Sequence, residues 1–222
     1  MYLVEVQAGS AEPGDRNTIA GSPILPPDQP WPECTCGERM MLFFQLDIPG
    51  DIPSFGGDHL LVFQCPAHNE DIVDQGEYTR QLPERFWADP EMVHPPGHAS
   101  WRILICRTGE PTADADRHLV SHRLTVRRDE EQIHHRRDGS VAGRREFKIG
   151  GVPSWIQEAE RFRCCCGIEM EYLCELEENF DFARIPGTDG DDPVLLLLGN
   201  EVYILACPAH CDPAAAWPVL HN

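Results

Sequence analysis

The sequence lacks any apolar run long enough to cross a bilayer. Runs such as residues 194–198 have five residues, whereas a membrane-spanning helix needs about 20. The first residues, Met-Tyr-Leu-Val-Glu-Val, contain neither the basic start nor the apolar stretch of a secretory signal. We therefore expect a cytoplasmic protein that has no membrane partner.

Positive charge is also scarce. The 222 residues include 18 Lys and Arg against 37 Asp and Glu, which gives a formal net charge of −19. Such a field repels the phosphate backbone of nucleic acids and favours a basic partner. Half of the basic residues lie between Arg117 and Lys148, mixed with five acidic ones, and we interpret this stretch as a solvated segment of mixed charge.

Short catalytic motifs are absent as well. The sequence has no Gly-x-Ser-x-Gly nucleophile elbow, no His-Glu-x-x-His zinc motif, no phosphate-binding Gly-x-x-x-x-Gly-Lys and no dinucleotide glycine pattern. An enzyme would need a site assembled from distant residues, with His118, His122 or Cys106 beside a carboxylate. We expect a protein that is not an enzyme, and a hydrolase with an unrecognised site remains an alternative.

Turn-forming residues are abundant, with 20 prolines and 18 glycines, and they favour short elements. We predict an α+β fold that is strongly β-rich. Apolar or alternating runs predict strands at residues 2–6, 40–46, 59–64, 101–106, 118–126, 170–176 and 202–206. In the run 170–177 the alternation places Glu171, Glu175 and Glu177 on a solvent-facing side. A helix is predicted after Asp212, because Pro213 and three alanines follow it.

An internal repeat organises the chain. Eight of 28 positions from Ile19 to Leu46 are identical to the residues 130 positions later, and Cys65-Pro-Ala-His68 returns unchanged at residues 207–210. We infer an ancestral duplication with half-repeats at residues 17–69 and 147–211, joined by a β-rich segment 81–146, within a single domain 1–222. The second copy has 12 additional residues between its cysteine clusters, which we place in the acidic loop around residues 187–192.

The ten cysteines are expected to be thiols in the cytoplasm, and most of them recur in the repeat. The first copy offers Cys34, Cys36, Cys65 and His68. The second offers Cys164, Cys166, Cys207 and His210, with Cys211 as the alternative to His210. Four thiolate-rich ligands are typical of a closed structural zinc site, so we expect one or two zinc ions. The alternative is that these are buried thiols without metal.

Two family resemblances follow from these motifs. Ile19-Ala-Gly-Ser-Pro23, Trp31-Pro32, Met41–Asp47 and Gly56-Gly57 resemble the YwqG-like bacterial family of domains of unknown function. Gly150–Trp155, Cys164–Gly167, Met170–Leu173 and Val202–Cys207 resemble the programmed-cell-death, ribosomal-protein-chaperone family. The first resemblance implies a β-rich duplicated protein without established catalytic residues, and in some relatives an immunity role beside toxin genes.

Together these features predict a zinc-binding, non-catalytic protein-interaction module. Its acidic balance and the second resemblance favour chaperone-like binding of a basic client. Two alternatives remain: an immunity protein that neutralises a toxin, and the hydrolase described above.

Overall fold

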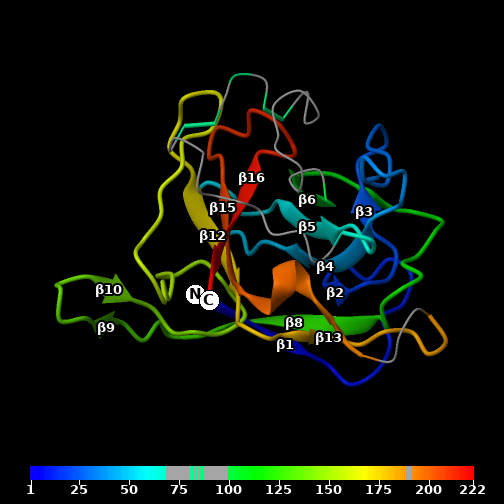
Figure 1. Cartoon of the computed structure of the whole chain (residues 1–222), viewed down its shortest axis with the longest axis horizontal. Helices are drawn as coiled ribbons and strands as arrows, with labels where there is room; N and C mark the ends of the chain where they lie inside the picture. The colour runs from blue at the N-terminus through cyan, green and yellow to red at the C-terminus, as the bar shows by residue number, and fades with distance from the viewer. Residues whose placement is uncertain (69–80, 83, 85, 88–99, 189–191) are drawn as a thin grey trace.

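Ten antiparallel strands form one continuous sheet in the computed structural model, which describes residues 1–68, 81–82, 84, 86–87, 100–188 and 192–222 (Figure 1). The sheet order is β16-β15-β12-β11-β1-β8-β2-β4-β5-β6. These strands are β1 (Tyr2–Val6), β2 (Thr18–Ile19), β4 (Met41–Asp47), β5 (His59–Gln64), β6 (Trp101–Cys106), β8 (His122–Arg128), β11 (Lys148–Ile149), β12 (Glu171–Leu176), β15 (Glu201–Ala206) and β16 (Ala216–His221). Three small two-stranded pairs complete the described strands: β3 (Ile24–Leu25) with β7 (Glu110–Pro111), β9 (His134–His135) with β10 (Val141–Ala142), and β13 (Asp181–Phe182) with β14 (Val194–Leu195). The β9–β10 hairpin projects from the body of the molecule (Figure 1).

The two halves of the sheet have the same strand order and register. β2, β4, β5 and β6 on one side of the central pair β1–β8 correspond to β11, β12, β15 and β16 on the other. Ile19 pairs with Phe44, and 130 positions later Ile149 pairs with Cys174. The β4–β5 ladder has an irregularity between residues 42 and 44, and the β12–β15 ladder has one between residues 172 and 174, at the same offset. Strand pairing and bulge position therefore coincide in the two halves.

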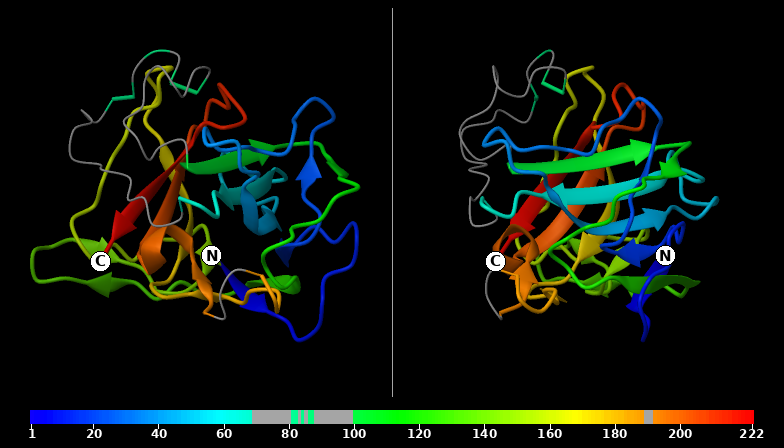
Figure 2. Two further views of the ribbon diagram at one scale, coloured as in Figure 1. Left: turned by 45° about the vertical axis from the view of Figure 1, so that its right-hand side comes forward. Right: turned by 90° about the vertical axis from the view of Figure 1, so that its right-hand side faces the viewer.

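The outer strands of the sheet approach each other, so that neither edge is fully open. The Ile105 N–H of β6 donates a hydrogen bond to the carbonyl of Pro213, just before β16, at 2.8 Å. Trp101 and Trp217 meet edge to face with ring centroids 5.7 Å apart. Figure 2 shows the strands of the first half running at a steep angle to those of the second. This closure protects backbone groups that an open edge would leave unpaired.

One apolar core joins the two halves. Phe44 of β4 packs against Phe147, next to β11, with centroids 5.0 Å apart, and Phe43 packs against Phe182 of β13 at 4.8 Å. Phe43, Phe44, Phe182 and Trp217 are all fully buried. The additional residues of the second copy lie between β12 and β15, where β13, β14 and a 3-10 turn, η3 (Leu196–Gly199), cover this core. Residues 189–191 of that loop and 88–99 of the connecting segment lie outside the described residues.

A strand lies at each predicted run, although the one expected at 118–126 begins only at His122 and ends at Arg128, whereas the predicted helix is wrong. The strands at 59–64 and 101–106 have the predicted bounds. After Asp212 the chain makes a single turn, in which Asp212 Oδ1 accepts a hydrogen bond from the Ala214 N–H at 2.8 Å. The chain then enters β16, because pairing with β15 and burial of Trp217 outweigh the helix propensity of the alanines. Among the described residues η3 is the sole helical element, and no helix has the length and apolar character needed to cross a bilayer.

Glu175 is buried, so the predicted solvent-facing row on β12 is wrong at this position. Its Oε2 accepts hydrogen bonds from the Ser154 N–H at 2.9 Å and the Tyr172 hydroxyl at 3.0 Å, and its Oε1 lies 3.7 Å from Lys148 Nζ. The equivalent residue of the first half, Gln45, is also buried, and its Oε1 accepts the N–H of Ile24. The N–H groups of Ile24 and Ser154, at equivalent positions of the two halves, thus each need a buried side-chain acceptor. The alternation of polar and apolar residues alone does not reveal this need.

Burial raises the pKa of Glu175 to about 7, although Lys148 acts in the opposite direction. Because this folded-state value lies above the ordinary one, the folded chain binds the proton more tightly than the unfolded chain. Stability from this group is therefore present at low pH and lost as the pH rises to about 7. We predict that the unfolding free energy of wild type, relative to Glu175→Gln, falls by roughly 2–3 kcal/mol between about pH 5 and pH 8.

Urea denaturation at several pH values measures this difference. Glu171→Gln, at the exposed end of the same strand, is the matched control and should follow wild type throughout. An unfolding difference between wild type and Glu175→Gln that does not change with pH would show that Glu175 is not held in a raised-pKa environment.

Candidate metal centres

A tight turn before β4 holds the first pair of cysteines. The Cys34 N–H donates to the carbonyl of Glu38 at 2.8 Å, and the Gly37 N–H donates back to the carbonyl of Cys34 at 2.9 Å. Gly37 has φ +87°, a left-handed conformation that favours glycine. The same two contacts recur 130 residues later around Gly167, which also has φ +87°. In each half the turn places two thiols, separated by one residue, at the start of a strand.

The second pair of ligands follows the neighbouring strand. Met41, where β4 begins, pairs with Gln64, where β5 ends, so antiparallel pairing places Cys65 beside the first turn. Glu171 and Ala206 form the same pair in the second half, and Cys207 follows Ala206. The hairpin register thus brings together cysteines that are about 30 to 40 residues apart in the chain.

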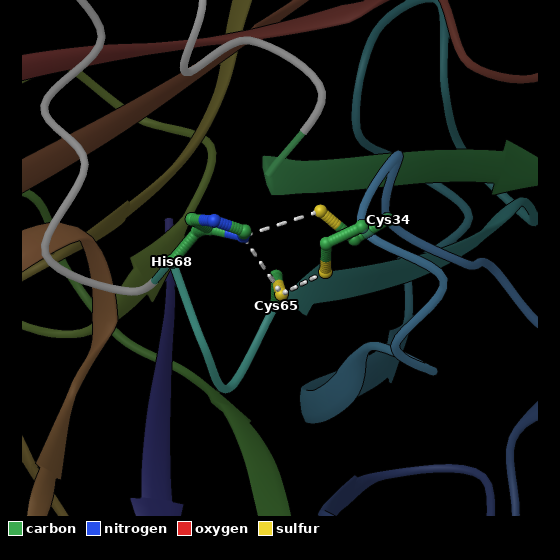
Figure 3. Close-up of side chains that lie close together, drawn as sticks. Cys34, Cys65 and His68 are labelled. Carbon is green, nitrogen blue, oxygen red and sulfur yellow. Dashed lines mark hydrogen bonds between the residues drawn. The ribbon is translucent and has the colours of Figure 1, made fainter.

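The first cluster consists of Cys34, Cys36, Cys65 and His68, whose ligand atoms all lie within 4.8 Å of one another. His68 Nδ1 lies 3.6 Å from Cys34 Sγ and 3.5 Å from Cys65 Sγ, and Cys36 Sγ lies 3.7 Å from Cys65 Sγ. Figure 3 shows Cys34, Cys65 and His68 directed toward one another. A tetrahedron with metal–sulfur bonds of 2.3 Å has sulfur–sulfur edges of about 3.8 Å, close to these separations.

The second cluster consists of Cys164, Cys166, Cys207 and Cys211, also within 4.8 Å of one another. Cys164 Sγ lies 3.3 Å from Cys211 Sγ, and Cys166 Sγ lies 3.5 Å from Cys207 Sγ. All are free thiols. The two clusters could each hold a metal ion, one with three sulfurs and a nitrogen and the other with four sulfurs.

His210 is directed away from the second cluster, and Cys211 takes the place that sequence analysis gave first to His210. The backbone of His210 has φ +47°, which turns the His210 side chain out of the Cys207–Cys211 turn. The Nε2 of His210 donates to the carbonyl of Ser54 at 2.9 Å, and the ring packs on Phe55. An identical Cys-Pro-Ala-His motif therefore supplies a histidine of the ligand cluster in one half and a contact between the halves in the other.

Local hydrogen bonds and burial act in opposite directions on the thiols. The backbone N–H of Glu38 lowers the pKa of the Cys36 thiol. Burial raises the pKa of Cys65 to about 12 and that of Cys207 to about 11. These two thiols would remain protonated at neutral pH without a cation, whereas a bound divalent metal takes them as thiolates.

Trp87 contacts the second cluster and had no signal in the sequence. Its indole N–H donates to Cys164 Sγ at 3.2 Å. Burial acts to raise the pKa of Cys164, but this bond and the backbone N–H of Cys166 outweigh burial, and the pKa is lowered. Gln81 adds a bond to the Cys164 carbonyl at 2.9 Å. These residues lie outside both repeats, so neither the motif nor the spacing indicates them.

The candidate catalytic residues do not form a dyad. Within the described part of the chain, none of His118, His122 and Cys106 has a side-chain hydrogen bond to a carboxylate. Cys106 lines a cavity with Asp58, but burial raises the pKa of its thiol to about 11, which disfavours the thiolate needed for attack.

Comparison with protein-family models and with curated proteins finds no match for this chain. The two family resemblances stay predictions, as does the immunity alternative. The support for the candidate metal centres is the geometry of the two clusters.

We predict that Cys211→Ser lowers the metal content by about one ion per chain, whereas His210→Ala retains full metal content. In the first half the histidine of the repeated motif is itself a ligand candidate. His68→Ala should therefore lower the metal content by about one ion per chain, because His68 is a member of that cluster. Elemental analysis of the purified variants measures the metal per chain. Loss of metal from His210→Ala with retention in Cys211→Ser would contradict the ligand set of the second centre.

Proposed function

We propose that each cluster holds one structural zinc ion and that the chain is a non-catalytic protein-interaction module whose client is basic. The observation that carries the zinc assignment is the convergence of two thiolate-rich donor sets with tetrahedral spacing. Zn²⁺ favours sulfur and imidazole ligands in a four-coordinate tetrahedral site. Four protein ligands leave no open position for water or substrate, so the ions act as scaffolding rather than as catalysts.

The shared strand order and bulge position support descent of the two halves from one duplicated unit. Two differences between the halves then record divergence after duplication. One is the fourth ligand, which is His68 in the first half and Cys211 in the second, and the other is the buried acceptor, which is Gln45 in the first half and Glu175 in the second. The zinc ligands on each β-hairpin are among the features that both halves retain.

The distribution of charge supports a basic client. Six of the nine cations between residues 117 and 148 lie within 4 Å of a carboxylate: Arg123, Arg127, Arg128, Arg144, Arg145 and Lys148. Arg136 instead donates to the carbonyl oxygens of Ser154 and Trp155. Because these cations are engaged internally, the mixed segment offers little free positive charge, and the excess of 19 negative charges is left to act on a partner.

We predict close to two zinc ions per chain after purification without added metal. Cys36→Ser and Cys166→Ser should each lower both the zinc content and the melting temperature, because metal binding contributes to the free energy of folding. Cys174→Ser, a buried cysteine outside both clusters, is the control that lowers stability without releasing zinc. Iron in place of zinc, or full metal content in both ligand variants, would refute the assignment.

We also predict that the zinc-loaded chain captures a basic protein from native lysate at low salt. The complex should dissociate progressively as salt is raised, because exposed charges are screened beyond about 8 Å at physiological ionic strength. An unrelated protein of similar net charge is the control bait and should not retain the same partner. A stoichiometric partner that is acidic, or one whose binding is insensitive to salt, would argue against charge-driven client binding.

A further inference from the structure

An aromatic cavity of about 390 Å³ lies outside the two metal centres. Its walls come from three parts of the chain: the loop that leads into Cys34, the edge strand β6, and the turn that follows Cys211. Its lining includes Trp31, Glu33, Trp87, Arg102, Leu104 and Asp212.

Arg102 of β6 is the unusual residue of this cavity. Within the described part of the chain its guanidinium has no hydrogen bond and no ion pair, although it is only partly exposed. Other arginines at similar depth are paired, such as Arg16 with Asp47 at 2.8 Å and Arg39 with Asp114 at 2.9 Å. Burial lowers the pKa of Arg102, and the carboxylate of Asp212, which lines the same cavity, acts in the opposite direction. The five N–H donors of the guanidinium still have no hydrogen-bond acceptor among the described residues, and an anion placed against them supplies one.

The fold does not require a charge at this position. Arg102 pairs with Phe63 of β5, and the equivalent residue of the second half, which pairs with Leu205 of β15, is Trp217. Trp217 is fully buried in the core. The same strand position is therefore satisfied by an apolar side chain in one half and carries, in the other, a cation without an ion pair among the described residues.

The aromatic walls offer ring edges and the uncovered part of the rings rather than hydrogen bonds, since the Arg39 guanidinium lies 3.5 Å from the Trp31 ring centroid and Trp87 is largely buried. The Trp31 indole N–H already donates to the carbonyl of Met40 at 2.7 Å, and that of Trp87 donates to Cys164 Sγ at 3.2 Å. Leu104 adds aliphatic surface. Guanidinium and apolar walls together suit a ligand with an anionic head and an apolar body.

Two carboxylates limit the charge that such a ligand can carry. Glu33 and Asp212 line the same cavity, and one oxygen of Asp212 already accepts the N–H of Ala214. They repel a dianion more strongly than a monoanion. A single carboxylate, which pairs with a guanidinium through two parallel hydrogen bonds, fits better than a phosphate.

We propose that this cavity binds a carboxylate carried on an apolar or aromatic body, anchored by Arg102 and enclosed by Trp31 and Trp87. The carboxylate can come from the C-terminal residue of a polypeptide or from a free small acid. The proposal does not depend on the basic client or on the identity of the metal.

Isothermal titration calorimetry on the metal-loaded full chain tests it with three probes: N-acetylphenylalanine, its uncharged amide, and benzyl phosphate. The acid should bind saturably, and about tenfold or more tightly than the amide, because a charge-assisted pair is lost with the carboxylate. Benzyl phosphate should bind more weakly than the acid. Equal affinity for acid and amide, tighter binding of the phosphate, or no saturable binding of the acid would overturn the proposal.

Variants locate the site. Arg102→Gln should weaken binding of N-acetylphenylalanine by about tenfold or more, and Arg102→Lys by less, because lysine keeps the charge but not the planar fork. Arg107→Gln, just beyond the same strand and outside this cavity, is the matched control and should bind like wild type. Unchanged affinity in Arg102→Gln would place the acid elsewhere.

Thermal melting separates binding from folding. Arg102→Gln should melt at about the wild-type temperature or above it, since the guanidinium has no hydrogen bond and no ion pair with a described residue and only a longer-range attraction to Asp212 is lost. A marked fall in melting temperature would show that Arg102 is structural and would contradict the proposal. A tripeptide ending in phenylalanine then distinguishes the sources: tighter binding than N-acetylphenylalanine indicates a polypeptide terminus, and weaker binding indicates a free acid.

Discussion

The register of one hairpin in each half is the constraint on which both candidate metal centres depend. Pairing of Met41 with Gln64, and of Glu171 with Ala206, places the beginning of one strand beside the end of the next. A cysteine turn precedes the first strand of each pair and a cysteine follows the second. A slip of a single residue would turn the strands over and separate the donors. The apolar core that fixes the register, with Phe43, Phe44 and Phe63 fully buried, is therefore also what assembles the ligands.

With metal bound, the ion and the sheet would support each other. Buried thiols such as Cys65 and Cys207 resist ionisation, and a bound divalent cation would supply the charge that makes them ligands. The four ligands would in return connect the turn before one strand to the turn after the next. His210 extends this linkage, because the turn that presents Cys211 also carries its bond to Ser54 in the other half. Ordering of the second centre and packing between the halves therefore involve the same few residues.

Much of this could be predicted from the sequence, because repeats and spacing are local signals. The identical Cys-x-Cys-Gly turns and the Cys-Pro-Ala-His repeats indicate seven of the eight clustered donors, and the apolar or alternating runs indicate seven of the ten strands of the large sheet. The choice between His210 and Cys211 as the eighth donor depends on the backbone angle φ of His210. The sequence shows two adjacent residues that can both bind metal, and it does not reveal that angle. Glu175, Trp87 and Arg102 could not be assigned for a different reason: their environments come from segments distant in the chain. Alternation of polar and apolar residues predicts which side of a strand faces solvent only where one face of the sheet is open. The prediction fails where loops cover both faces, as they do around Glu175.

Zinc K-edge X-ray absorption on protein purified without added metal tests the two centres most directly, because it counts ligands around the ion. Seven sulfurs and one nitrogen shared by two ions give an average of about 3.5 sulfurs per zinc at about 2.3 Å. We expect that sulfur-dominated shell. A shell dominated by oxygen or nitrogen, or one with fewer than about three sulfurs per zinc, would contradict the assembly of these cysteines into closed metal centres.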